Sequence, residues 1–83
     1  MDRSEIVGTV RELAVEVLGV EPAAVTEDAR FADDLDADSL DLVELVMAVE
    51  ERLDITIPEN ELEGVETVGQ AISLVSDKLS TRA

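Results

Sequence analysis

The helical spacing of apolar residues most constrains the fold of this chain, because it recurs in three separate segments. Residues three and four positions apart fall on one face of an α-helix, so each segment predicts an amphipathic helix with a buried stripe. Phe31 is the single aromatic residue, so the predicted core consists mainly of Leu, Val, Ile and Ala. The stripes are Ile6, Val10, Leu13, Ala14, Val17 and Leu18 near the N-terminus, Leu42, Leu45, Val46, Val49 and Leu53 in the middle, and Val68, Ile72, Val75 and Leu79 near the C-terminus.

Local signals predict where the first two helices begin and end. Asp2 and Glu5 have the spacing of a capping box ahead of the first helix, and Gly19 is placed to end it. The second helix is predicted to begin near Asp38, which serves as its N-cap, and to run to about Leu53. Between these two helices, residues 19–38 form a predicted long loop.

This first loop lacks helical periodicity and contains Pro22. A loop of this length is uncommon in a compact domain, and it is usually either functional or attached to the core. Four apolar side chains are therefore predicted to pin it to the core, namely Val20, Val25, Phe31 and Leu35.

The C-terminal part completes the predicted fold. Residues 54–58 are predicted to be extended, and Pro58 at a first helical position predicts one short helical turn over residues 59–62. Thr67 and Gln70 form a second capping-box pattern at the start of the last helix. The predicted fold class is all-α: a small four-helix bundle with three main helices, one short helix and a long first loop, in a single domain over residues 1–83.

The charge balance restricts the partners. Six basic and 21 acidic residues give a net charge of −15, which repels nucleic acid and anionic membranes and favours partners with basic surfaces. The longest apolar run, Leu45–Val49, is too short to span a bilayer, and the N-terminal sequence lacks the plan of a signal peptide. We therefore expect a cytoplasmic protein that does not insert into membranes.

Catalysis by the chain itself is not expected. Nucleophilic hydrolases use a base, usually His, beside a Ser or Cys, and the chain contains neither His nor Cys. Lys78, the only Lys, has an ordinary explanation as a solvated helix residue. The sequence also gives no sign of a cleft that would separate the pKa values of a carboxylate pair. No catalytic residue is assigned.

The cluster of Asp residues before the second helix partly resembles an EF-hand calcium-binding loop. Asp34, Asp36 and Asp38 alternate as in the first half of an EF-hand. Ser39, however, stands where that loop needs its turn-forming Gly, and Leu45 stands where it needs a bidentate Glu. No metal site is assigned, although clustered carboxylates can attract divalent ions loosely. A non-enzymatic acidic adaptor or weak calcium buffer remains an alternative function.

One hydroxyl lies inside this acidic patch at the start of the second predicted helix, that of Ser39. Taken alone, a Ser beside a helix start is common. The stretches FADDLDADSLDLVELVMAVEE and ITIPENEL, however, closely resemble the bacterial fatty-acid type of the acyl carrier protein family. The hallmark of that family is Asp-Ser-Leu, here Asp38, Ser39 and Leu40. The resemblance extends from about residue 5 to residue 79.

The resemblance implies a carrier function. In the family, the Ser hydroxyl, here Ser39, is joined by a phosphodiester to 4′-phosphopantetheine, whose thiol carries acyl groups as thioesters. The implied partners are a phosphopantetheinyl transferase and basic-surfaced ketosynthases, acyltransferases, reductases and dehydratases, and the implied state is a monomer. Fatty-acid synthesis is the expected pathway, with polyketide or non-ribosomal peptide assembly as the alternative.

The resemblance also implies two sets of contact residues. Partner-binding positions are Asp38, Leu40, Asp41, Val43, Glu44, Met47, Glu50 and Glu51, and acyl-pocket positions are Phe31, Val46, Leu62 and Ala71. The acids are also explained by a solvated face, and the pocket residues by an ordinary core. Leu40, Val43 and Met47 favour the docking interpretation, because they form a second apolar strip beside the acids.

The chain departs from the family pattern at two positions. Asp36 stands where Gly is frequent, and Leu74 stands where Tyr is common. Asp36 adds a negative charge close to Ser39, which could alter the choice of partner.

Overall fold

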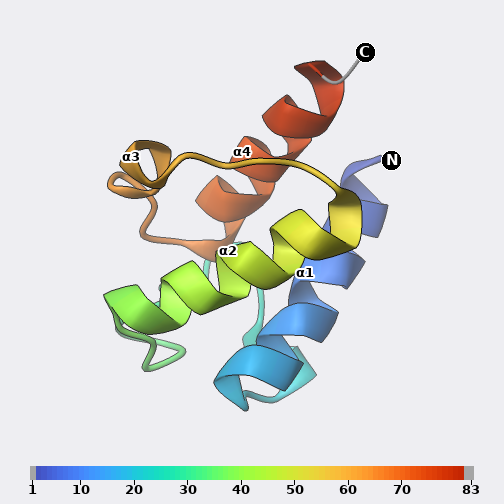
Figure 1. Ribbon diagram of the computed structural model, residues 1–83. Coiled ribbons are helices and arrows are strands. Elements are labelled where there is room, and N and C mark those ends of the chain that lie inside the picture. The colour runs from blue at the N-terminus through green and yellow to red at the C-terminus, as the bar shows by residue number, and fades with distance from the viewer. Residues whose placement is uncertain (1, 82–83) are drawn as a thin grey trace.

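The fold is all-α, as predicted, and it is described here for residues 2–81 of a computed structural model. Figure 1 shows α2 crossing α1, with the short α3 in the connection that leads to α4. Apart from one isolated β-bridge, residues 2–81 contain no strand, and none of their helices has the length and apolar character needed to cross a membrane. The elements are α1 (Arg3–Leu18), the 3₁₀ turn η1 (Pro22–Ala24), α2 (Ser39–Leu53), α3 (Glu59–Leu62) and α4 (Val68–Thr81).

Helix α1 begins after Asp2 and ends before Gly19, as predicted, and one of the two bonds of the predicted capping box is present. Asp2 Oδ1 accepts a hydrogen bond from the Glu5 backbone N–H at 2.9 Å, which satisfies one of the free N–H groups of the first turn. Gly19 follows the last helical residue with φ of 70°, a left-handed conformation that glycine adopts without steric cost.

The N-terminus of α4 is closed by the predicted capping box. Gln70 N–H donates to Thr67 Oγ1 at 3.2 Å, and Thr67 N–H donates to Gln70 Oε1 at 3.0 Å. Gln70 Oε1 also accepts from the Glu66 N–H at 2.6 Å, a bond beyond the two-residue pattern. These contacts fix where the chain enters α4.

The core lies between the inner faces of α1, α2 and α4. The centre of each predicted stripe is buried, whereas residues at the ends, such as Leu42, Leu53 and Leu79, are only partly buried. Five residues outside the predicted stripes and pins are also buried: Ala29, Ala37, Ile55, Ile57 and Ala71. The extended segment after α2 therefore contributes to the core through its Ile side chains.

The long first loop is attached to the core and to the start of α4. Val25, Phe31 and Leu35 are buried as predicted, while Val20 is only partly buried. Backbone bonds add to this attachment: Phe31 N–H donates to Glu66 O at 3.0 Å, and Val68 N–H donates to Ala29 O at 3.0 Å. The loop is thereby held where it delivers the chain to α2.

Candidate functional site

Ser39 is the first residue of α2 and is exposed. Its hydroxyl makes no hydrogen bond with any residue of the described chain. The first backbone bond at this end of the helix is Leu42 N–H to Asp38 O, at 3.0 Å. The N–H groups of Ser39 and Leu40 come before it and so have no acceptor within the helix. The site thus offers an accessible oxygen beside free donors at the positive end of a helix dipole.

The start of α2 is held by a reciprocal capping box. Asp38 Oδ1 accepts from Asp41 N–H at 2.9 Å, and Asp41 Oδ2 accepts from Asp38 N–H at 3.3 Å. The sequence predicted Asp38 as the cap but not the returning bond from Asp41. Both carboxylates are therefore engaged in fixing the helix end that presents Ser39.

Asp36 makes the turn that leads into this helix. Its φ of 52° is left-handed, a conformation that Asp tolerates better than most side chains but less well than glycine. The side chain is exposed, three residues before Ser39. It adds negative charge at the site and stores some backbone strain.

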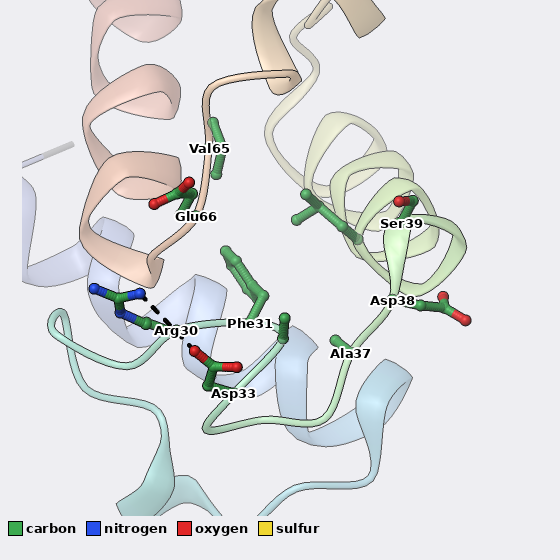
Figure 2. A pocket seen from close by; sticks show the side chains of 10 residues that line it. Arg30, Phe31, Asp33, Ala37, Asp38, Ser39, Val65 and Glu66 are labelled. Carbon is green, nitrogen blue, oxygen red and sulfur yellow. Dashed lines mark ion pairs between the residues drawn. The ribbon is translucent and has the colours of Figure 1, made fainter.

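Two hollows open beside Ser39, and both are lined by Ser39, Leu42 and Val65. The loop-side hollow, of about 380 Å³, is lined in addition by Arg30, Phe31, Ala32, Asp33, Ala37, Asp38 and Glu66. In Figure 2, Phe31 lies between Arg30 on one side and Ser39 on the other. The α3-side hollow, of about 360 Å³, is lined in addition by Val43, Glu59, Leu62 and Glu63.

The structure distributes the predicted acyl-pocket residues among different places. Phe31 lines the loop-side hollow and Leu62 lines the α3-side hollow. Val46 and Ala71 are buried in the core and line neither hollow. The four residues are therefore not gathered in one open pocket, and their assignment stays a prediction.

The predicted partner face lies along α2. Leu40 and Met47 are 66% and 57% exposed, which is unusual for large apolar side chains on a helix that packs into a core, and Val43 is partly buried. Asp38, Glu44 and Glu51 are exposed and Asp41 is partly buried. The partner-binding role of these residues stays a prediction.

Glu50, another predicted contact residue, bonds to a backbone group outside α2. Its Oε2 accepts a hydrogen bond from the Ile57 N–H at 2.7 Å, and its side chain is only partly exposed. This bond ties the end of α2 to the connection that carries Ile57 into the core. Its partner lies seven residues away in the chain, and no local sequence pattern predicted the contact.

The geometry beside Ser39 is suited to an anionic group. A phosphodiester on Ser39 Oγ could accept hydrogen bonds from the free N–H groups of Ser39 and Leu40, so the residues present fit this group. Within residues 2–81, no three His, Cys, Asp or Glu side chains form a group that could hold a metal ion.

Most of the chain matches a known protein family and its members. Residues 8–75 match the family described as phosphopantetheine attachment site. The chain is 51% identical to the acyl carrier protein of Caulobacter vibrioides, over 90% of this chain and 96% of that protein. It is 53% identical to the acyl carrier protein of Sulfurovum sp., over 82% of this chain and 91% of the relative. It is 48% identical to the acyl carrier protein of Petrotoga mobilis, over 96% of this chain and 94% of that protein.

These matches cover most of this chain and most of each relative, and they therefore show its family. The chain belongs to the acyl carrier protein family, and the resemblance found from the sequence is confirmed.

Proposed function

We propose that this protein carries acyl groups as thioesters on a 4′-phosphopantetheine arm joined to Ser39, and that it presents them to the enzymes of fatty-acid synthesis. The observation that supports this most is the exposed Ser39 hydroxyl at the start of α2, which bonds to no other residue in the described part of the chain. The arm supplies a terminal thiol, which a chain without Cys cannot provide itself.

The chain positions the arm and leaves bond making to other proteins. The capping box of Asp38 and Asp41 holds the end of α2, so the Ser39 oxygen projects from a fixed point. The N–H groups of Ser39 and Leu40 offset the repulsion between a phosphodiester and the nearby carboxylates. A phosphopantetheinyl transferase would supply magnesium, coenzyme A and the catalytic groups. In this proposal the chain is a carrier and not an enzyme.

The outer face of α2 is the proposed docking surface. Exposed Leu40 and Met47 would contact apolar patches on partner enzymes, and the acids around them would pair with Lys and Arg. The net charge of −15 supports rapid association with basic surfaces. The proposed partners are cytoplasmic ketosynthases, acyltransferases, reductases and dehydratases, which act on a monomeric carrier.

Intact mass measurement tests the attachment. The purified chain is incubated with a broad-specificity phosphopantetheinyl transferase, coenzyme A and magnesium, and we expect a gain of one phosphopantetheine. Ser39→Ala should gain nothing. Ser4→Ala, which removes another exposed Ser in the first turn of a helix, should gain as much as the unmodified chain. An undiminished gain on Ser39→Ala would refute the proposal.

The pathway needs a separate test, because polyketide and peptide carriers share the same attachment chemistry. The loaded protein is charged with malonyl groups and offered to purified ketosynthases of the fatty-acid and polyketide types. Faster elongation by the fatty-acid enzyme is expected. A preference for the polyketide enzyme would retain the carrier function and change the pathway.

A further inference from the structure

Among residues 2–81, Arg30 is the only basic residue that lines the loop-side hollow, and none lines the α3-side hollow. Its Nη1 lies 3.8 Å from Asp33 Oδ2, and the two side chains are 61% and 73% exposed. An exposed pair at this distance contributes little free energy, because water screens it and the long Arg30 side chain must be ordered. The guanidinium can therefore exchange Asp33 for a better acceptor at low cost.

The backbone of Arg30, in contrast, is firmly held. Arg30 forms the antiparallel bridge with Thr67, and its N–H donates to Asp34 Oδ2 at 2.7 Å. The next residue, Phe31, is buried and bonded to Glu66 O. The side chain of Arg30 thus starts from a fixed point at the edge of the hollow, and only its own torsions remain to be ordered.

The two hollows differ in the groups that they offer to a ligand attached at Ser39. Phe31, Leu42 and Val65 give the loop-side hollow an apolar lining. Both hollows contain carboxylates, in the loop-side hollow those of Asp33, Asp38 and Glu66, but Arg30 adds cationic donors to the loop-side hollow. The charged residues of the α3-side hollow are Glu59 and Glu63, which only accept when ionised. A phosphopantetheine arm is rich in acceptors, namely phosphate and carbonyl oxygens, which a guanidinium binds well.

We propose that Arg30 is a positioning residue for the phosphopantetheine arm: its guanidinium exchanges Asp33 for acceptor oxygens of the arm and so retains the arm on the loop side of α2. In Figure 2, Arg30 and Ser39 lie on opposite sides of Phe31, so contact with both would extend over the apolar lining. This inference rests on the function proposed above and adds the side of α2 on which the arm is held.

Backbone and arginine side-chain N–H chemical shifts test the role of Arg30. Apo and fully loaded forms are compared for the unmodified chain, Arg30→Gln and Arg52→Gln, with loading verified by intact mass. Arg52 is a matched control, because its Nη1 also lies 3.8 Å from a carboxylate, that of Glu12, and it lines neither hollow. Loading should shift the Arg30 Nε–H and the amides of Phe31 and Val65. Arg30→Gln should lose about half or more of the amide shifts, and Arg52→Gln should retain them.

Asp33→Asn gives a test in the opposite direction. Removing the competing carboxylate should enlarge the shift of the Arg30 Nε–H on loading. The inference is overturned if Arg30→Gln retains the full shifts, if Arg52→Gln loses as much, or if loading shifts mainly Glu59 to Glu63 in every variant. Failure of the unmodified chain to load would instead refute the proposed function, so the two failures are distinguishable.

Discussion

At the scale of single residues, the site depends on how a flexible chain is made to present one hydroxyl. Asp38 and Asp41 fix the helix end by bonding each other's backbone N–H groups. Asp36 turns the chain into that helix in a left-handed conformation. The carboxylates nearest Ser39 thus include two with a structural task, and their charge is an additional property that partners can recognise.

The strain at Asp36 leads to a stability prediction. Asp36→Gly relieves the left-handed conformation and removes one of the negative charges near Ser39, so the free energy of unfolding should rise by about 0.5–1 kcal/mol. Asp36→Asn is the control, because it removes the charge but keeps a side chain at φ of 52°. Urea unfolding measures both variants. If Asp36→Gly is no more stable than Asp36→Asn, the backbone is not strained at this position.

At the scale of elements, the position of the first loop depends on its close approach to α4. Gly69 N–H donates to Glu27 O at 2.8 Å, and Glu27 also pairs with Arg3 of α1 at 2.6 Å. A Cβ on residue 69 would lie 2.9 Å from Glu27 O, closer than side chains normally approach a backbone oxygen. Glycine is needed at this position because the loop backbone leaves no space for a side chain.

Two glycine substitutions test this contact. Gly69→Ala should lower the free energy of unfolding by about 1–3 kcal/mol, because the loop backbone must move away from α4. Gly8→Ala is the matched control within α1, where a Cβ would meet nothing within 4 Å, and it should raise stability by about 0.5–1 kcal/mol. Thermal or urea unfolding gives both values. Equal effects of the two substitutions would contradict the close approach of the loop to α4.

At the scale of the whole molecule, the net charge of −15 lowers the stability of the fold, because its carboxylates repel one another and the core that opposes this repulsion is small. The ion pairs described here are exposed or partly exposed, at Arg3–Glu27, Arg30–Asp33, Arg52–Glu12 and Lys78–Glu61. Such pairs offset little of the repulsion among the remaining carboxylates.

Added salt should therefore stabilise the protein. Raising sodium chloride from about 10 mM to about 300 mM shortens the Debye length from about 30 Å to less than 8 Å, so the melting temperature should rise, and millimolar magnesium should act similarly. A variant with Glu16→Gln, Asp28→Asn and Glu63→Gln should have a higher melting temperature at low salt, and this temperature should change less when salt is added. Calorimetry measures the melting temperatures of the variant and the unmodified chain. A melting temperature indifferent to ionic strength would show that charge repulsion is not the main destabilising term.

The sequence alone determined the helices, most of their ends and the family. These features depend on neighbours along the chain: the spacing of apolar residues, the capping pairs such as Thr67 with Gln70, and Gly19 after α1. The short range of these interactions is the reason why they can be found without a structure. The single-domain organisation and the roles of the predicted contact residues stay predictions.

The tertiary structure decided how the loops meet the helices. The bond from Ile57 to Glu50, the bridge of Arg30 with Thr67 and the approach of Gly69 to Glu27 join residues whose neighbours in sequence carry no matching signal. The tertiary structure also places two of the predicted pocket residues, Phe31 and Leu62, at two different hollows. Sequence periodicity shows which face of a helix is apolar, but only the packing of distant segments decides what that face touches.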